Sequence, residues 1–117
     1  VGYGRKFIAE RETRIATLPV GYADGYIRAY AGGSVEVCGK RAPIAGRVCM
    51  DQFMIAVDTA GTHANKPAHE IRYGDVVTLI GKDGDQEITA DEMADLRETI
   101  NYEVVCNFGA RLDKVYI

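Results

Sequence analysis

Apolar and polar residues alternate over short stretches through most of the chain, which is the pattern of half-buried β-strands. The stretch TRIATLPVG (residues 13–21) predicts a strand that ends at Pro19-Val20-Gly21. The stretch SVEVCGKRAPIAG (34–46) predicts two short strands joined by a two-residue hairpin turn at Gly39-Lys40. The next stretch, RVCMDQFMIAVD (47–58), predicts a further strand of the same sheet. The first half of the chain is therefore expected to be a sheet of short strands.

The second half of the chain continues this pattern. DVVTLIGKDGDQEIT (75–89) predicts a second hairpin with Asp83-Gly84 as its turn. NYEVVCNFGARLDKVYI (101–117) predicts two more strands around Phe108-Gly109. Strands thus dominate both halves, and no internal repeat or long linker separates them.

One stretch, TADEMADLRE (89–98), has the pattern of a helix instead. Thr89 is a favourable N-cap, and Glu92 three positions later completes a capping box. Met93 and Leu96 give the helix an apolar side. The sequence therefore predicts one short helix after the second hairpin.

These elements predict a mainly β fold: a small β-barrel-like domain of short strands with one short helix. The 117 residues suit a single domain (1–117), and 47% hydrophobic with 26% charged residues is an ordinary globular composition. A net charge of −3 favours neither nucleic acid nor an anionic membrane as a partner. No apolar run approaches the roughly 20 residues of a spanning helix. The chain opens at Val1, without Met or a signal peptide, and we expect it to be a piece of a longer protein.

The residues that commonly bind metals or form disulfides are few and poorly spaced. An odd number of cysteines without a CxxC spacing makes a poor disulfide framework and a poor zinc site, and favours a reducing, cytoplasmic setting. Both histidines, His63 and His69, fall in the polar segment TAGTHANKPAHE (59–70), which is expected to be a surface loop. No metal site is predicted. The cysteines are Cys38, Cys49 and Cys106.

Several tyrosines stand beside glycine or in polar surroundings. Glycine on both sides of Tyr3 allows a sharp bend of the backbone and exposes the ring. A phenol can transfer a proton only where its neighbours stabilise the anion, so a turn residue with its hydroxyl in water is the alternative. Asp24-Gly25, taken alone, predicts only a turn. The tyrosines of this kind are Tyr3, Tyr22, Tyr26 and Tyr102.

The stretch GRVCMDQFMI (46–55) places a guanidinium, a thiol, a thioether and a carboxylate within five positions of an otherwise strand-like segment. Such a set predicts chemistry at the centre of the strand. The alternative is a buried strand in which Arg47 pairs with Asp51. Cys49 is expected to pack as a small apolar residue rather than to act as a nucleophile.

Five ordered motifs together closely resemble the C-terminal β domain of the pyridoxal-phosphate-dependent alanine racemases. The resemblance runs from Val1 to about Ile117 and is interrupted only around Thr59 to Glu70. The motifs, in chain order, are VGYGRKF, IATLPVGYADGYIR, GRVCMDQFMI, GDVVTLIG and ETINYEV.

The resemblance implies an N-terminal (β/α)₈ barrel that holds pyridoxal 5'-phosphate as a Schiff base on a lysine. It also implies a head-to-tail homodimer in which each active site joins one subunit's barrel to the other subunit's C-terminal domain. The implied substrate is alanine, and the implied setting is cytoplasmic. The D-isomer would serve peptidoglycan synthesis.

The resemblance further implies a role for particular residues. Tyr3 is the acid–base group at one face of the substrate Cα, and the barrel lysine lies at the other face. Met50 and Asp51, with Cys49 beside them, are the substrate-binding residues. The strand that holds them is expected to reach the neighbour's active site, where Met50 offers its backbone N–H, Asp51 fixes the strand and Arg47 attracts the anionic substrate. Tyr102 also approaches the cofactor phosphate in its own subunit. The residues implied to line the substrate-access corridor are Tyr22, Arg28, Arg47, Ile100 and Tyr102.

The chain does not contain all the groups that the reaction needs. Lys6 and Lys40 do not match the family's cofactor lysine, which belongs to the barrel. The arginine at the pyridine nitrogen and the histidine coupled to the tyrosine belong there too. The 117-residue chain alone is therefore expected to be inactive.

Two alternatives remain. One is a serine-preferring racemase of the vancomycin-resistance type, in which the same domain follows a membrane-embedded region; a smaller polar residue is common there in place of Tyr102. The other is a non-catalytic binding or assembly module, against which the presence of Tyr3, Met50, Asp51 and Tyr102 argues.

Overall fold

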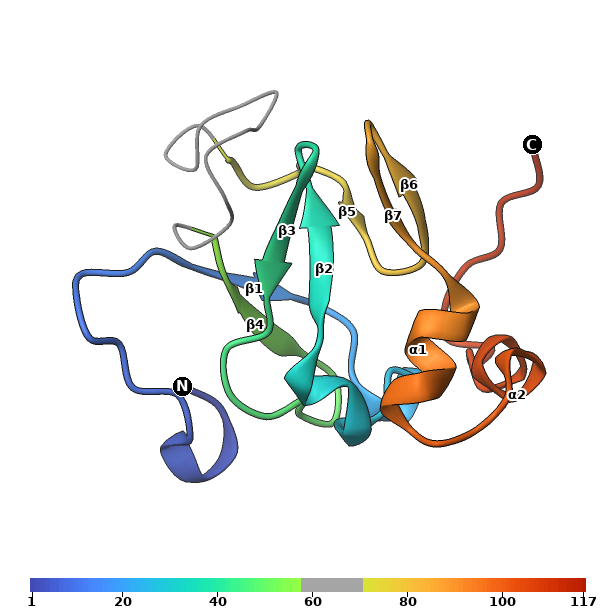
Figure 1. Cartoon of the computed structure of the whole chain (residues 1–117), viewed down its shortest axis with the longest axis horizontal. Coiled ribbons are helices and arrows are strands. Elements are labelled where there is room, and N and C mark those ends of the chain that lie inside the picture. Colours follow the sequence, from blue (N-terminus) through green and yellow to red (C-terminus); the bar gives the residue numbers. More distant parts are fainter. Residues whose placement is uncertain (58–70) are drawn as a thin grey trace.

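The computed structural model describes residues 1–57 and 71–117, and these form short strands and short helices (Figure 1). The predicted mainly β fold is confirmed. The strands are β1 (Ile15–Leu18), β2 (Ser34–Val37), β3 (Lys40–Pro43), β4 (Phe53–Ala56), β5 (Val77–Thr78), β6 (Gly81–Asp83) and β7 (Gln86–Ile88). The helices are the 3₁₀ turns η1 (Tyr3–Arg5), η2 (Tyr22–Asp24) and η3 (Arg28–Gly32), and α1 (Ala90–Leu96) and α2 (Asn101–Cys106).

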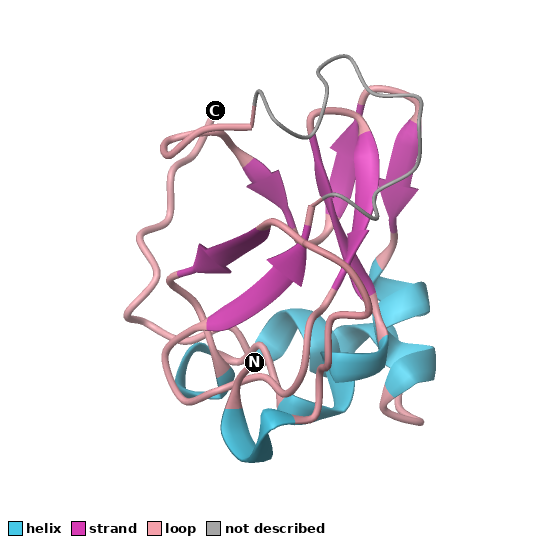
Figure 2. Cartoon of the chain, turned by 90° about the vertical axis from the view of Figure 1, so that its left-hand side faces the viewer, coloured by secondary structure: helices cyan, strands magenta, loops and turns pink. Residues whose placement is uncertain are grey.

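The strands form three small antiparallel sheets: β1 with β4, β3-β2-β5, and β6 with β7. An isolated bridge between Ile44 and Ile55 links the end of β3 to β4. Over the two described ranges these sheets do not close into a barrel. Figure 2 shows the helices gathered at one end of the strands. No helix in these ranges is long and apolar enough to cross a membrane.

Both predicted hairpins are present, each with its turn displaced by one residue. The turn between β2 and β3 consists of Cys38 and Gly39, one position before the predicted Gly39-Lys40. Both turn residues have positive φ, 50° and 76°, as a type I′ turn requires. The turn between β6 and β7 is Gly84-Asp85 rather than Asp83-Gly84. Alternation of residues located the strands, whereas the register that places the turn depends on packing.

The centre of the core is an aromatic cluster. Tyr26 stacks on Phe53 of β4 with ring centroids 4.6 Å apart, and its ring is 5.0 Å from that of Tyr30. All three side chains are fully buried. Tyr26, which the sequence grouped with the tyrosines in polar surroundings, is a core residue, and burial raises the pKa of its phenol. This cluster fixes the segment 20–30 against the β1–β4 sheet.

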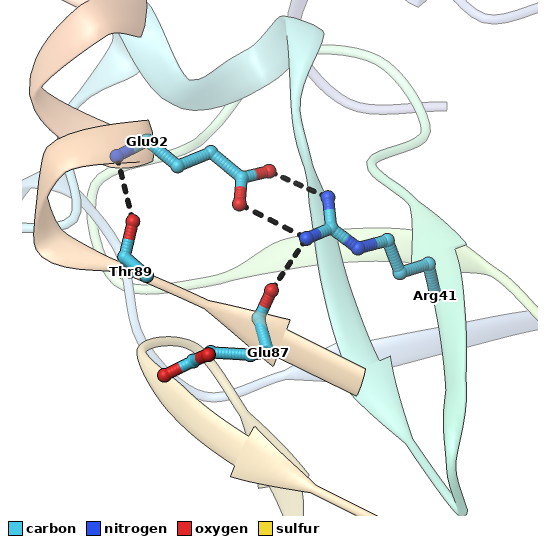
Figure 3. Close-up of polar contacts among 4 residues, drawn as sticks. All are labelled: Arg41, Glu87, Thr89 and Glu92. Carbon is cyan, nitrogen blue, oxygen red and sulfur yellow. Dashed lines mark hydrogen bonds and ion pairs between the residues drawn. The ribbon is translucent and has the colours of Figure 1, made fainter. Parts of the chain in front are cut away.

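Helix α1 begins where the sequence predicts. The Thr89 hydroxyl accepts a hydrogen bond from the Glu92 backbone N–H at 3.0 Å, so Thr89 is the N-cap. The Glu92 carboxylate does not complete the predicted capping box. It binds the Arg41 guanidinium of β3 at 2.5 and 2.9 Å, and Arg41 also donates to the Glu87 carbonyl oxygen at 2.6 Å (Figure 3). The ion pair therefore ties α1 to the first hairpin.

The strands predicted over residues 101–117 are wrong, because α2 occupies the first part and no regular element follows it. The β-branched and aromatic residues of this stretch have high strand propensity. Tertiary contacts override that propensity: Val104 is buried in the core, and the Glu103 carboxylate accepts hydrogen bonds from Arg97 at 2.7 Å and Thr99 at 2.8 Å.

Candidate functional site

The segment Gly46–Gln52, which we call the platform loop, is irregular rather than part of a strand. The backbone N–H of Cys49 donates to the carbonyl oxygen of Gln52 at 2.9 Å and closes a tight turn. The strand predicted from residue 47 begins only at Phe53. Within the described residues Arg47 and Asp51 do not form the alternative ion pair either. The segment that holds the polar cluster is a loop on which two other segments dock.

The first docked segment carries Tyr3. Gly46 has φ +81°, and a Cβ there would lie 2.5 Å from the carbonyl oxygen of Val1. Gly2, with φ +68°, similarly approaches the Arg47 carbonyl oxygen, 3.2 Å from the position of a Cβ. The sharp bend around Tyr3 is therefore confirmed. Its side chain is 44% exposed, and its phenol oxygen accepts the Met50 N–H at 3.4 Å.

The second docked segment carries Tyr22. A Cβ on Gly21 would lie 2.2 Å from the Cys49 carbonyl oxygen, so only glycine permits this approach. The N–H of Tyr22 donates to the Cys49 carbonyl at 3.1 Å, and the N–H of Ala23 donates to the Met50 carbonyl at 2.9 Å. Two consecutive backbone hydrogen bonds thus fix η2 to the platform loop.

A buried carboxylate holds η2 from its other side. The Asp24 side chain is fully buried, accepts the Gly21 N–H at 2.9 Å and receives two hydrogen bonds from the Arg111 guanidinium. Arg111 holds the pKa of Asp24 below its ordinary value. The N–H of Gly109 also donates to the Asp24 carbonyl at 2.9 Å. The sequence predicts only a turn at Asp24, because Arg111, the partner of its carboxylate, lies 87 positions away and no local pattern connects the two residues.

The docked segments place Tyr3 and Tyr22 near one another. The neighbouring Tyr3 phenol and desolvation raise the pKa of Tyr22, and the cation of Arg28 opposes the rise. Cys49 is 5% exposed, with its sulfur 3.8 Å from the Arg47 carbonyl oxygen, so the thiol packs inside the platform loop.

The structure divides the predicted site residues into two groups. One group surrounds the platform loop, and we call it the tyrosine site. The other lies at α2: Ile100 precedes the helix and is 62% exposed, and Tyr102 within it is 73% exposed. Figure 1 shows η1 and α2 on opposite sides of the domain. The tyrosine site comprises Tyr3, Tyr22, Arg28, Arg47, Cys49, Met50 and Asp51.

The two histidines fall outside the described residues, so the prediction that His63 and His69 bind no metal stays a prediction. The same applies to the surface loop predicted over residues 59–70.

Comparison with known proteins gives consistent matches over the whole chain. The family model described as "Alanine racemase, C-terminal domain" matches residues 1–116. The chain is 46% identical to alanine racemase 1 of Bacillus subtilis (strain 168), over all of this chain and 28% of that protein. The crystal structure of alanine racemase from Bacillus anthracis with bound L-Ala-P is similar with a TM-score of 0.79 and 41% identity, over 93% of this chain and 26% of that one. A histidine racemase from Leuconostoc mesenteroides subsp. sake is similar with a TM-score of 0.81 and 31% identity, over 100% of this chain and 29% of that one.

Proposed function

Because the chain belongs to the family of alanine racemase C-terminal domains, we propose that it is part of a racemase that interconverts L- and D-alanine. The chain spans 28% of the length of its Bacillus subtilis relative. The complete activity therefore requires groups beyond these residues. The D-alanine formed would serve peptidoglycan synthesis.

The observation that carries this proposal is the exposed phenol of Tyr3, whose oxygen accepts the Met50 N–H. Racemisation requires a proton to leave one face of the substrate Cα and another to arrive at the opposite face. A phenol that projects from the domain surface on a bent, glycine-flanked turn can serve one face. The opposite face would be served by a lysine of the N-terminal barrel. Pyridoxal phosphate, when bound, supplies the electron sink for the Cα carbanion.

The platform loop supports a substrate-binding role for Met50 and Asp51. The Met50 N–H makes only a long hydrogen bond of 3.4 Å to the Tyr3 oxygen, so it can turn to the substrate carboxylate. The Met50 side chain is 51% exposed and can supply an apolar contact as well. The negative charge of Asp51 helps to raise the pKa of Arg111. Asp51 therefore lies near the ion pair that anchors η2. Cys49 contributes through its carbonyl oxygen rather than its thiol.

The separation of the two groups of residues supports a head-to-tail homodimer. Tyr3 lies on one side of the domain, whereas Ile100 and Tyr102 lie at α2 on the other (Figure 1). One copy of the domain can therefore contribute Tyr3 to the partner's active site and Tyr102 to its own. Arg28 and Arg47 at the tyrosine site supply positive charge that attracts an amino-acid carboxylate along the corridor.

An exposed tyrosine on α2 is suited to a supporting contact with the cofactor. Tyr102 exposes its phenol on α2, where it can donate a hydrogen bond to the cofactor phosphate. Lys40 is buried on β3 at the hairpin, away from η1 (Figure 1), so the Schiff-base lysine is expected from the barrel. The three cysteines are free thiols, which fits a reducing, cytoplasmic setting.

Sequence likeness favours alanine as the substrate. The Bacillus alanine racemases are 46% and 41% identical to the chain, whereas the histidine racemase is 31% identical. The histidine racemase nevertheless shares the fold, so the fold alone does not select the substrate side chain. Tyr102 also favours alanine over serine, because a smaller polar residue is common at this position in serine-preferring racemases.

The test uses the full-length protein that contains this domain, loaded with pyridoxal phosphate. We expect racemisation of alanine, and we expect Tyr3→Phe to slow Cα proton exchange from one enantiomer by about 10²–10⁴-fold, the usual contribution of an acid–base group. Tyr73→Phe is the matched control, because that phenol is fully exposed outside the tyrosine site. If both variants exchange protons like the wild type, Tyr3 is only a turn residue. Turnover by the 117-residue chain alone with added cofactor would also contradict the proposal.

A further inference from the structure

The Tyr3 phenol contacts the platform loop through its oxygen. Tyr3 lies on η1, a 3₁₀ turn of three residues, between Gly2 and Gly4, which both have φ +68°. Its side chain is 44% exposed, and its oxygen accepts the Met50 N–H at 3.4 Å. Proton transfer requires the transferring oxygen to be held within reach of the reacting carbon. Any group that restricts the direction of the Met50 N–H therefore helps to place that oxygen.

The Met50 N–H belongs to the same peptide unit as the Cys49 carbonyl. A trans peptide unit is planar, so its C=O and its N–H turn together. The Tyr22 N–H donates to the Cys49 carbonyl oxygen at 3.1 Å, while the N–H at the other end of the unit donates to the Tyr3 oxygen. The next carbonyl, that of Met50, accepts the Ala23 N–H at 2.9 Å. The position of η2 thus restricts the direction of the N–H that contacts the phenol.

The position of η2 depends in turn on Asp24. Its carboxylate is fully buried, accepts the Gly21 N–H at 2.9 Å and forms a bidentate pair with the Arg111 guanidinium. The Asp24 carbonyl also accepts the Gly109 N–H at 2.9 Å. Loss of Arg111 would leave a buried charge unpaired, which is costly enough to move the carboxylate toward water. The turn that carries Asp24 would move with it.

Close packing leaves η2 little room to absorb such a movement. A Cβ on Gly21 would lie 2.2 Å from the Cys49 carbonyl oxygen, and a Cβ on Gly25 would lie 2.0 Å from the Asn107 carbonyl oxygen. The turn is therefore in backbone contact with both the platform loop and the segment that leads to Arg111. A displacement at Asp24 is passed on to the Cys49 carbonyl rather than lost in a gap.

We propose that Asp24 and Arg111 are positioning residues for proton transfer by Tyr3: through η2 they orient the peptide unit whose N–H contacts the phenol oxygen. The proposal rests on the proposed function of Tyr3. In the transfer, the proton moves between the substrate Cα and the Tyr3 oxygen, and neither Asp24 nor Arg111 gains or loses a proton. A pair that only stabilised the fold would lower exchange from both enantiomers by the same factor, whereas a positioning pair affects the enantiomer that Tyr3 serves.

The experiment measures Cα–deuterium exchange from each enantiomer of alanine in the full-length protein loaded with pyridoxal phosphate. The variants are Asp24→Asn, Arg111→Gln and Arg111→Lys, each with and without Tyr3→Phe. Glu92→Gln is the matched control, because it breaks another bidentate pair, with Arg41, outside the tyrosine site (Figure 3). Thermal unfolding shows that each loaded variant is folded at the assay temperature. If Asp24→Asn does not fold, Arg111→Lys, which keeps a cation beside Asp24, carries the test.

We expect Asp24→Asn and Arg111→Gln to slow exchange from the enantiomer that Tyr3 serves about 10- to 100-fold more than exchange from the other, since a misplacement of about 1 Å can cost about 100-fold. Arg111→Lys should fall between Arg111→Gln and the wild type, because lysine keeps the charge without the planar fork. With Tyr3→Phe present, these changes should not alter the ratio of the two exchange rates further. Altered substrate binding at Met50 would act on both enantiomers, which share the carboxylate, and Glu92→Gln should keep the wild-type ratio.

An equal loss for both enantiomers, or a further change of the ratio in the Tyr3→Phe background, would overturn the positioning role. If Tyr3→Phe leaves the ratio unchanged, the proposed function fails and the positioning role fails with it. If Tyr3→Phe changes the ratio but the folded variants of Asp24 and Arg111 do not, the positioning role alone fails.

Discussion

Glu36 is a buried carboxylate in the core of the described chain. It lies on β2 with no exposed surface, and neither carboxylate oxygen has a hydrogen-bond partner. It faces Arg41 across the β2–β3 pair, but the Arg41 guanidinium is bound to Glu92 and to the Glu87 carbonyl (Figure 3). Burial raises the pKa of Glu36 above its ordinary value of 4.5, the Arg41 cation opposes this, and nearby carboxylates add to the rise.

The sign of the pH dependence follows from the raised pKa of Glu36. In the folded chain the carboxyl group is protonated up to a higher pH than in the unfolded chain. Its contribution is therefore most favourable below pH 4.5 and is lost as the pH rises through the folded pKa. Each pKa unit between the folded and the unfolded Glu36 lowers the unfolding free energy by about 1.4 kcal/mol at a pH above both pKa values. We expect Glu36→Met, which keeps the side-chain length without a polar group, to raise the unfolding free energy at pH 7 by about 1–3 kcal/mol.

Urea unfolding of the chain at pH 4.5 and pH 7 measures this effect. The gain in unfolding free energy from Glu36→Met should be larger at pH 7. At pH 4.5 the Glu36 carboxyl of the wild type is protonated to a greater extent, so its burial destabilises the fold less. Glu12→Met is the matched control: Glu12 is exposed, so its replacement should change the unfolding free energy little and equally at both pH values. A carbon-13 titration of the Glu36 carboxyl gives its pKa directly. A value at or below 4.5, or equal gains at both pH values, would refute the reasoning.

Three further changes test other parts of the structure. Asp24→Asn removes a buried, hydrogen-bonded charge and should lower the unfolding free energy by about 1.5–3 kcal/mol at pH 7; because Arg111 lowers the pKa of Asp24, urea unfolding should show this loss shrinking as the pH falls below 3.8, and a loss independent of pH would contradict the ion pair. Thr89→Ala removes the N-cap of α1 and should cost about 1 kcal/mol by the same assay, whereas an equal cost from an exposed threonine such as Thr17→Ala would show that capping is not the cause. Tyr102→Asn in the full-length protein should raise the serine-to-alanine ratio of kcat/KM and weaken cofactor binding, because asparagine removes the ring and offers a donor and an acceptor to a serine hydroxyl; a ratio that stays the same or falls with the cofactor bound would remove the basis for preferring alanine.

Features with a local cause could be predicted from the sequence. The strands, the two hairpins and the N-cap of α1 depend on alternation, glycine-containing turns and one hydroxyl three residues before its partner, all of which lie within a few positions. The motif VGYG predicts a sharp bend because glycine surrounds Tyr3, and the bend is present.

Features that depend on distant contacts could not be predicted in the same way. Alternation assigned Arg47 to a strand, whereas the docking of Val1 on Gly46 and of η2 on Cys49 makes this segment a loop. In α2 the strand propensity of Val104 gives way to burial against the core. In each case the deciding partner lies elsewhere in the chain, where a local pattern carries no information about it.

The segment GYADGY shows how the core determines the geometry of the site. Tyr22 and Tyr26 have similar neighbours in the sequence, yet Tyr22 is 39% exposed and Tyr26 is fully buried against Phe53. Gly25 separates them with φ +100°, and a Cβ there would lie 2.0 Å from the Asn107 carbonyl oxygen, so the backbone must turn at this position and must do so without a side chain. The stacked ring of Tyr26 then anchors one end of the turn, and its N–H closes the turn on the Gly21 carbonyl at 3.2 Å. Because Tyr22 is carried on that turn, a change that loosens Tyr26 in the core should also displace Tyr22 from its place beside Tyr3.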